Sequence, residues 1–294
     1  IKPMPTQAAL VFEAVSKTFA AGVLTVRALD GIDIQIQPGR VTGLIGPDGA
    51  GKTTLMRLAA GLLLPDTGRI QVLDIDVREQ PLRVQSSVGY MPQRFGLYED
   101  LSVQENLDLY ADLQGVPKGE RAERYRELMH LTGLAPFTRR LAGRLSGGMK
   151  QKLGLACTLV RPPRVLLLDE PTVGVDPVSR RELWEIIYRQ VRDEGMTVLL
   201  STAYLDEAER CDEVILMHQG KRLGQGTPAS FSEPMRGRSF HLTAASMSKR
   251  VLQGRLSVVP GIVDAIIEGE QVRVVTAPGG MPSLPEDLAA TDGL

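Results

Sequence analysis

Gly46-Pro47-Asp48-Gly49-Ala50-Gly51-Lys52-Thr53 is a glycine-rich segment between two predicted elements of regular structure. It fits the pattern G-x-x-x-x-G-K-[ST], in which glycines let backbone N–H groups wrap around phosphates. The apolar run 41–45 before it indicates a buried strand, and residues 51–61 indicate a helix. This strand–loop–helix context favours a phosphate-binding loop, or P-loop, over a chance glycine-rich turn.

The loop also carries the side chains that a nucleotide needs. Lys52 supplies a point charge for the β- and γ-phosphates, and the Thr53 hydroxyl is a ligand suited to Mg²⁺. The N-terminus of the following helix adds positive potential. These residues predict a site for Mg-ATP or a similar nucleotide.

A second group of candidate residues ends an apolar run further along the chain. Val165-Leu166-Leu167-Leu168 precedes two carboxylates, Asp169 and Glu170. Asp169 can bind Mg²⁺, directly or through water, and Glu170 can orient and deprotonate an attacking water. Many buried strands end in an acidic turn, so this pair is weak by itself. A P-loop upstream in the same chain favours the functional interpretation.

The segment Leu145-Ser146-Gly147-Gly148-Met149-Lys150-Gln151 has a serine and two glycines at a predicted helix start. The simplest interpretation is that Ser146 caps the helix. A hydroxyl, bare N–H groups and a helix dipole also make an anion site. Such a site can bind the γ-phosphate of a nucleotide that a partner protein holds.

The order of predicted elements indicates an α/β fold with a mainly parallel core sheet. Antiparallel strands come first and form a flap. Strands are predicted at residues 10–18, 24–37, 41–45, 69–73, 87–91, 165–169, 197–201 and 213–217, and helices at 51–61, 147–160, 177–193 and 205–211.

Two parts of the chain depart from that alternation. Residues 94–145 are polar and helical, with Ser102 and Glu105 spaced as a capping box, and we assign them to a helical subdomain. Residues 236–294 predict strands at 239–243, 264–267 and 271–276 around a helix at 248–258. We therefore expect a first domain over 1–235 and a small α+β accessory domain over 236–294.

Composition excludes several classes of protein. The net charge is −1, which argues against nucleic acid as a partner, and aromatic residues are only 4% of the chain. No apolar run approaches the roughly 20 residues of a membrane-spanning helix, and the start is not a signal peptide. The first residue is not Met, so we expect a trimmed chain or a fragment. Cys157 and Cys211 are interpreted as buried core residues.

Together with Gln93 in Tyr90-Met91-Pro92-Gln93, and with Leu168–Thr172 and Val175–Pro177, these motifs resemble the ATPase subunits of ABC transporters. The resemblance covers about residues 10–230. The segment 96–101 is most similar to subunits of drug-efflux-type exporters, and above all to the first half of fused tandem ABC ATPases. The resemblance implies ATP and Mg²⁺ as cofactors and hydrolysis of ATP as the reaction.

The resemblance also implies roles for single residues. Lys52, Gln93 and Glu170 are the implied catalytic residues, and Thr53, Gln93 and Asp169 the implied Mg²⁺ ligands. Gln93 would also link the site to the helical subdomain, and Asp176 would help two sites communicate. Phe19 would stack on adenine, although a core aromatic is the alternative. The implied ATP-binding set is Phe19, Gly46, Pro47, Asp48, Gly49, Ala50, Gly51, Lys52, Thr53, Thr54, Ser146, Gly147 and Gly148.

Three positions depart from the family pattern. The family usually has Ser-Thr-His where this chain has Ser201-Thr202-Ala203, and a methyl group cannot bond a γ-phosphate. Loss of one preorganised donor typically costs about 10²- to 10³-fold in rate. Asp48 stands where Asn is common, and Met149 replaces the usual Gln. We therefore expect a site that binds Mg-ATP but hydrolyses it slowly, with a second domain supplying a competent site.

The resemblance implies partners as well as chemistry. Ser146, Gly147 and Gly148 would complete the ATP site of an opposing ATPase domain, in a homodimer or a tandem protein. Transmembrane subunits would dock near 96–101, on the cytoplasmic face of the inner membrane. Phe95, Leu97 and Tyr98 make either that contact patch or the subdomain core. The alternative function is a soluble ABC-type ATPase acting on ribosomes, or a regulatory ATP-binding module.

Overall fold

The structure is a computed structural model that describes residues 8–22, 24–94, 96–244, 247–280 and 282. Contacts within the chain divide it into two compact units, Ile1–Pro228 and Ala229–Leu294, which are described separately below. Compact units defined by contacts need not be domains that fold alone. The domain assignment 1–235 and 236–294 therefore stays a prediction.

The first unit is built on a six-stranded sheet whose order is β10-β9-β3-β8-β7-β6. The five strands from β9 to β6 are parallel, and β10 joins β9 in antiparallel fashion. Their bounds are β3 Val41–Ile45, β6 Val88–Met91, β7 Val165–Asp169, β8 Thr197–Thr202, β9 Glu213–His218 and β10 Lys221–Gly226. Every residue of β3, β7 and β8 is buried, as continuous apolar strands of a sheet covered on both faces should be.

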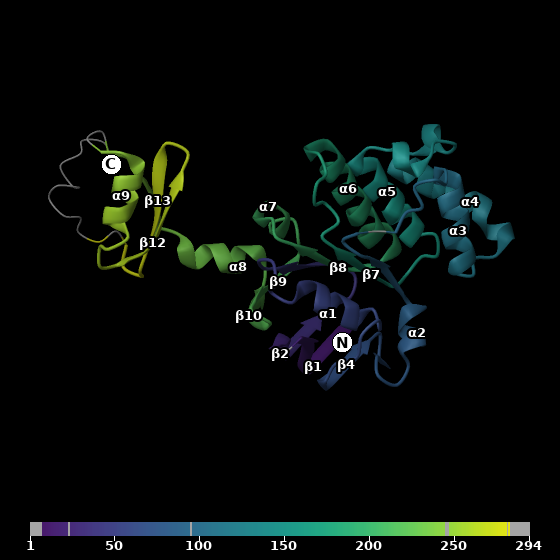
Figure 1. The fold of residues 1–294 in the computed structure, drawn as a ribbon, viewed down its shortest axis with the longest axis horizontal. Coiled ribbons are helices and arrows are strands. Elements are labelled where there is room, and N and C mark those ends of the chain that lie inside the picture. The colour runs from purple at the N-terminus through teal and green to yellow at the C-terminus, as the bar shows by residue number, and fades with distance from the viewer. Residues whose placement is uncertain (1–7, 23, 95, 245–246, 281, 283–294) are drawn as a thin grey trace, which may run out of the picture. The chain divides into compact units, whose positions relative to one another are not determined.

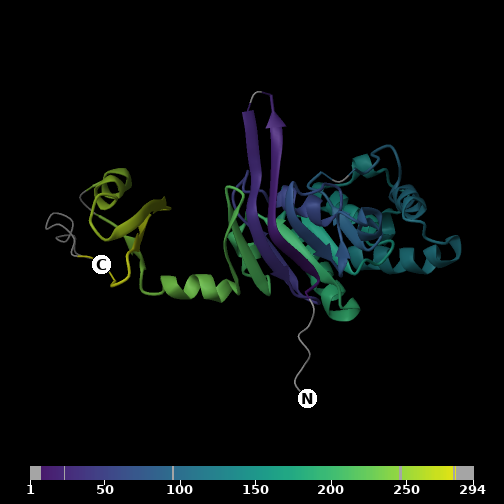
Figure 2. The same ribbon diagram turned by 90° about the horizontal axis from the view of Figure 1, so that it is seen from below.

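A second, antiparallel sheet has the order β2-β1-β4-β5. Its strands are β1 Leu10–Ala21, β2 Leu24–Ile36, β4 Thr67–Val72 and β5 Ile75–Asp76. Figure 2 shows β1 and β2 running side by side beyond the rest of this sheet. Its apolar residues and those of α1, Lys52–Ala59, share one core with β3 and β7. In Figure 1, α1 lies below the main sheet and α5 and α6 lie above it.

The remaining regular elements of the first unit are helices. They are α2 Pro81–Gln85, α3 Val103–Leu113, α4 Lys118–Thr132, α5 Gly147–Thr158, α6 Pro177–Glu194 and α7 Leu205–Ala208, with short 3₁₀ turns at Ala135–Phe137 and Ala142–Arg144. Both α3 and α4 pack against α5 and form the expected helical region (Figure 1). The capping box is confirmed: Glu105 N donates to Ser102 Oγ, and Ser102 N donates to Glu105 Oε2.

The second unit contains a three-stranded antiparallel sheet of order β11-β13-β12 with one helix packed on it. Its elements are α8 Pro228–Ser232 from its second residue on, a 3₁₀ turn Glu233–Met235, β11 Ser239–Leu242, α9 Lys249–Leu256, β12 Ile262–Glu268 and β13 Gln271–Thr276. Leu252 and Leu256 of α9 meet Val272 and Val274 of β13 in a small core of its own. The strands and helix expected after residue 236 are thus confirmed.

The α/β fold with its parallel sheet, antiparallel flap, helical region and α+β appendix is confirmed, with a few local errors. The helix expected over 205–211 ends at Ala208. It ends because Asp212 is already held by β3: Asp212 N donates to Val41 O, and Val41 N donates to Asp212 Oδ2. Strand β10 was missed since its sequence, Lys-Arg-Leu-Gly-Gln-Gly, has no apolar alternation.

Both cysteines are buried and free, as expected. Burial raises the pKa of the Cys211 thiol to about 12 and raises that of Cys157 further. Helices long and apolar enough to cross a membrane are absent from the described residues.

Candidate functional site

The P-loop joins β3 to α1, and its glycines occupy positions that other residues tolerate poorly. Gly49 and Gly51 have φ of 76° and 100°, in the left-handed region. A Cβ at Gly46 would collide with Met217 O, and one at Gly51 would lie 2.5 Å from Ala28 O. The loop therefore depends on glycine to pass between β9 and β2, with its N–H groups beside a helix N-terminus.

A pocket of about 450 Å³ opens at this loop. Four separate parts of the chain line it: strand β2, the P-loop with the start of α1, one residue after β6 and one residue after β7. The lining residues are Val26, Arg27, Ala28, Asp48, Gly49, Ala50, Gly51, Lys52, Thr53, Thr54, Gln93 and Glu170. The structure thus brings most of the expected ATP-binding residues to one pocket.

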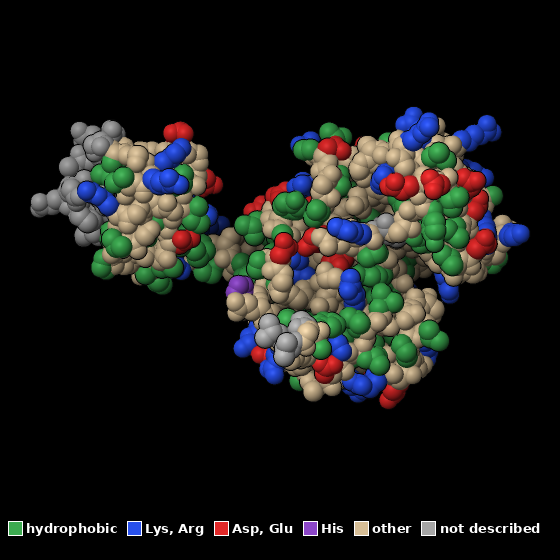
Figure 3. All heavy atoms as spheres, in the orientation of Figure 1, with side chains coloured by type: hydrophobic (Ala, Val, Ile, Leu, Met, Phe, Trp, Pro, Cys, Tyr) green, Lys and Arg blue, Asp and Glu red, His purple; other side chains and the backbone are tan. Residues whose placement is uncertain are grey.

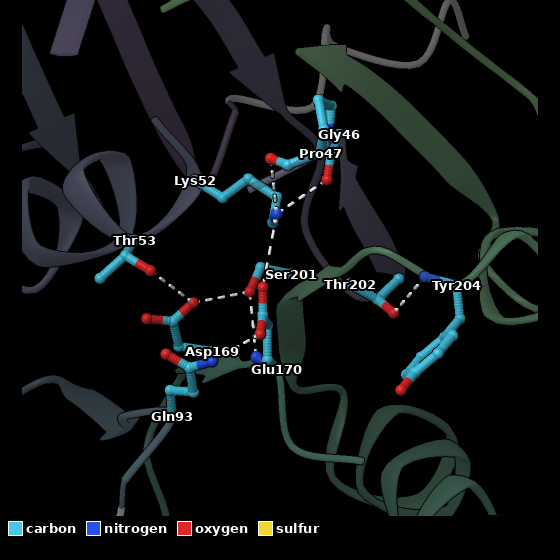
Figure 4. A network of polar contacts seen from close by, with 10 residues as sticks. All are labelled: Gly46, Pro47, Lys52, Thr53, Gln93, Asp169, Glu170, Ser201, Thr202 and Tyr204. Carbon is cyan, nitrogen blue, oxygen red and sulfur yellow. Dashed lines mark hydrogen bonds and ion pairs between the residues drawn. The ribbon is translucent and has the colours of Figure 1, made fainter. Parts of the chain in front are cut away.

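Lys52 is held from two sides in this pocket (Figure 4). Its ammonium group donates to Gly46 O at 2.8 Å and to Pro47 O at 3.2 Å, and lies 3.4 Å from Glu170 Oε1. Only 4% of Lys52 is exposed. A buried and preorganised cation beside a glycine loop suits a phosphate group.

Asp169, at the end of β7, accepts hydrogen bonds from several hydroxyl groups. Its Oδ1 accepts from Thr53 Oγ1 at 3.2 Å and from Ser201 Oγ at 2.7 Å. Tyr90 OH lies 3.5 Å from Asp169 Oδ2, and the pKa of Tyr90 is raised by burial first and by the Asp169 charge second. Thr53 and Asp169, which were expected to share a metal ion, therefore converge.

Glu170 lies where β7 ends, with a backbone conformation that non-glycine residues seldom adopt. Its φ is +51°, and its N–H donates to Ser201 Oγ at 3.0 Å and Ser201 O at 3.2 Å. Gln93 Nε2 donates to Glu170 Oε2 at 2.7 Å. Such strained positions recur at functional sites, and here the strain turns the carboxylate toward Lys52 and Gln93.

Ser201 was not among the predicted site residues. It bonds both Asp169 and the Glu170 N–H, and so fixes the two carboxylates relative to each other. A signal was present, since Ser201 is the last residue of the predicted strand 197–201, and parallel strands place their carboxyl ends at one edge of the sheet. A lone serine after an apolar run was not enough to single it out.

Ser146, Gly147 and Gly148 start α5 but do not line the pocket at the P-loop. Ser146 Oγ accepts from Met149 N at 3.3 Å, so the capping interpretation is confirmed. Gly147 is exposed. Other residues of the same chain line the P-loop pocket. The role of Ser146, Gly147 and Gly148 toward an opposing domain stays a prediction.

Phe19 and Asp176 are not among the residues that line the pocket. Phe19 is 38% exposed and pairs across the strands with Val26, so it is not a core aromatic, and its stacking on adenine stays a prediction. Asp176 caps α6, accepting from Val178 N and Ser179 N. These bonds, led by the one from Ser179, hold the pKa of Asp176 below its usual value.

The segment after β8 lacks a polar side chain at residue 203. Ala203 is exposed, and Tyr204 N donates to Thr202 Oγ1 at 3.0 Å. Figure 4 shows the Tyr204 ring directed away from Lys52 and Glu170. Tyr204 therefore does not replace a donor at the phosphate end of the pocket in this arrangement.

The patch expected near the helical region is partly exposed. Tyr98 is 57% exposed, whereas Leu97 is half-buried. Phe95 lies outside the described residues. The choice between a docking patch and a subdomain core stays open.

Residues 29–173 match the family model described as ABC transporter. The daunorubicin/doxorubicin resistance ATP-binding protein DrrA of Streptomyces peucetius is 37% identical over 238 residues, which are 79% of this chain and 72% of that protein. The chain belongs to the ABC transporter ATP-binding family. Its fold is that of ABC cassette structures.

A longer member of this ABC family is also similar. The probable multidrug ABC transporter ATP-binding protein YbhF of Escherichia coli (strain K12) is 52% identical over 263 residues. The match covers 90% of this chain and 45% of that relative, so the chain spans less than half of that relative's length. Among solved structures, cbiO1 from Clostridium perfringens has a TM-score of 0.70 at 27% identity, covering 85% of this chain and 96% of that one.

Proposed function

We propose that this chain binds and hydrolyses ATP and thereby powers export by membrane-embedded ABC transporter subunits. One observation carries the proposal: Lys52, Gln93 and Glu170 meet through contacts of 3.4 and 2.7 Å in a pocket at the P-loop. Lys52 binds the β- and γ-phosphates, Gln93 orients the catalytic carboxylate, and Glu170 takes the proton from the attacking water.

Mg²⁺ fits the oxygen donors present. The Thr53 hydroxyl and the Asp169 carboxylate lie 3.2 Å apart, and Mg²⁺ prefers oxygen ligands, usually one or two carboxylates together with substrate phosphates. Thr53 and Asp169 would hold the ion, with Gln93 near it. When bound, Mg²⁺ would offset the negative charge of the phosphates. Groups of three or more His, Cys, Asp or Glu that could hold a metal are absent from the described residues.

The turnover of this site is proposed to be slow. Ala203 offers no hydrogen bond beside the P-loop, and Tyr204 is turned away from Glu170 (Figure 4). A second ATPase domain, either another copy or a tandem partner, would supply the groups that this pocket lacks. The segment Ser146–Gly148 supports this, because it is a helix N-terminus that lies outside the lining of the P-loop pocket.

The relatives support the exporter interpretation. The names of the similar proteins include multidrug and daunorubicin/doxorubicin resistance. Transmembrane subunits are the proposed partners, and the proposed location is the cytoplasmic face of the inner membrane. Nucleic acid is not a proposed partner: on the face drawn in Figure 3, basic and acidic side chains are interspersed. A soluble ATPase acting on ribosomes, or a regulatory ATP-binding module, is the alternative.

The experiment that tests the proposal is steady-state hydrolysis of Mg-ATP across protein concentration, with Lys52→Ala as the control. Turnover that rises faster than linearly and disappears in Lys52→Ala supports hydrolysis by a dimer of this chain. Fast turnover already at low concentration, abolished by Glu170→Gln, contradicts the slow site. Absence of ATP binding contradicts the whole proposal. Co-purification with membrane subunits, compared with ribosomes, separates the exporter from the alternative.

A further inference from the structure

Arg180, in the second turn of α6, contacts three residues that follow β8. Its guanidinium carbon lies 4.7 Å from the centre of the Tyr204 ring, Nη1 lies 3.5 Å from Asp206 Oδ2, and Nε lies 3.7 Å from Glu207 Oε1. Only 24% of the Arg180 side chain is exposed. A planar guanidinium can stack on a ring and face carboxylates at the same time, which an ammonium group cannot do.

The contact with Glu207 is the important one, because Glu207 is completely buried. Its exposed fraction is 0%, and neither of its carboxylate oxygens has a hydrogen-bond partner. Among the described residues, Arg180 is the cation within 4.0 Å of it. A buried carboxylate is costly unless a cation compensates it. The position of α7, which carries Glu207, therefore depends on Arg180.

Only residues 203 and 204 separate α7 from β8. Because Arg180 contacts Tyr204 in this short loop and Glu207 in α7, it also restrains the loop. At the β8 end of the loop, Thr202 pairs in register with Ile45 of β3, and Thr202 Oγ1 accepts a hydrogen bond from Tyr204 N. Ala203 therefore follows directly after the residue that pairs with Ile45, the last residue before the P-loop. The loop is thus fixed by the sheet on one side and by α6 on the other.

Helix α6 is itself close to the site in sequence. Its N-cap is Asp176, and the segment 170–175 before it begins with Glu170. Arg180 consequently joins α6, which follows β7, to the segment that follows β8, and Ser201 near the end of β8 bonds both Asp169 and the Glu170 N–H. We propose that Arg180 is a positioning residue for ATP hydrolysis, which holds the 203–204 loop against α6. This inference rests on the proposed function.

The first test compares Arg180→Met with Arg181→Met, since Arg181 is the next residue of the same helix and is exposed. Misplacement of groups at a reacting centre by about 1 Å can cost about 10²-fold in rate. We expect kcat to fall about tenfold or more in Arg180→Met, while KM and the Kd for Mg-ATP stay within about twofold. Arg181→Met should match the unmodified chain. An unchanged kcat in Arg180→Met, or an equal loss in Arg181→Met, overturns the proposal.

Tyr204 provides a second comparison that does not disturb the buried pair. Tyr204→Phe keeps the ring under Arg180, whereas Tyr204→Ala removes a ring that is 37% exposed. We expect Tyr204→Phe to keep the full kcat and Tyr204→Ala to lose several-fold, with little further loss in the double variant Arg180→Met/Tyr204→Ala. Full additivity of the two losses contradicts a shared role.

Amide hydrogen exchange gives a readout that does not need turnover. Arg180→Met should raise the exchange rate of residues 203–208 and leave β1 and β2 unchanged, and Arg181→Met should do neither. Unchanged exchange at 203–208 overturns the proposal. If the unmodified chain binds Mg-ATP without hydrolysing it, the proposed hydrolysis has failed, and the exchange comparison alone decides the role of Arg180.

Discussion

Lys52 Nζ lies 3.4 Å from Glu170 Oε1, and the side chains of both residues are at most 10% exposed. The cation of the P-loop is therefore also the partner of the proposed general base. A phosphate bound at Lys52 brings negative charge close to that carboxylate. In the proposed function, substrate binding and proton abstraction would thus be coupled electrostatically through one ion pair.

Replacing Glu170 tests this coupling. Glu170→Gln removes the proton acceptor and the charge, but keeps the size of the side chain. We expect turnover to fall about 10²- to 10⁴-fold, the range of a lost general base. ATP affinity should rise, since the repulsion between carboxylate and phosphate disappears. Nucleotide titration and steady-state hydrolysis measure both effects, with the exposed Glu185→Gln on α6 as the control. Weaker ATP binding in Glu170→Gln would argue against the coupling.

Restoring a polar side chain at residue 203 should raise the rate. Residue 203 directly follows Thr202, which pairs with Ile45, the last residue before the P-loop. A histidine there can donate a hydrogen bond toward a phosphate, and one such donor is worth about 10²-fold or more in rate. We expect Ala203→His to increase kcat and Ala203→Leu to leave it unchanged. Equal rates in all three proteins would mean that residue 203 does not face the substrate.

The two glycines that start α5 should differ sharply in their tolerance of alanine. A Cβ at Gly148 would collide with Ser179 Oγ and Cβ on α6, whereas one at Gly147 meets only Gly174 O at 3.4 Å. Gly148→Ala must therefore push α5 and α6 apart, at a cost of about 1–3 kcal/mol in the free energy of unfolding. Gly147→Ala should cost much less. Denaturant unfolding of both variants measures the difference, and equal losses would contradict the close helix contact.

The capping box of α3 predicts a stability that depends on pH. Ser102 holds the pKa of Glu105 below its usual value, first by the bond from its hydroxyl and second by its backbone N–H. A lowered pKa contributes stability that is present above the unfolded value and is lost as the pH falls through the folded value. We expect Ser102→Ala to cost about 1 kcal/mol at pH 7, as the loss of a serine cap does. The difference should shrink near pH 3, and a constant difference from pH 7 to pH 3 would contradict the prediction.

The sequence alone identified the P-loop, the strand that ends at Asp169 and Glu170, and the start of α5. Each of these is local: a fixed spacing of glycines, a run of apolar residues, or a serine before a helix. The bounds of β3 and β7 agree with their predicted ranges, because apolar runs between turns leave little choice. The short polar strand β10 was missed. Its own sequence has no strand pattern, and it is a strand because it pairs with β9.

The tertiary structure alone decided which of these residues meet. Gln93 and Glu170 are 77 positions apart, and Ser201 and Asp169 are 32 apart, yet their side chains are within hydrogen-bond distance. No local pattern encodes such pairs, because they arise only when β6, β7 and β8 align in one parallel sheet. The same holds for Arg180 and Glu207, whose pairing depends on how α6 packs beside α7. Sequence periodicity determines which elements form, and the packing of the elements determines which charges face one another.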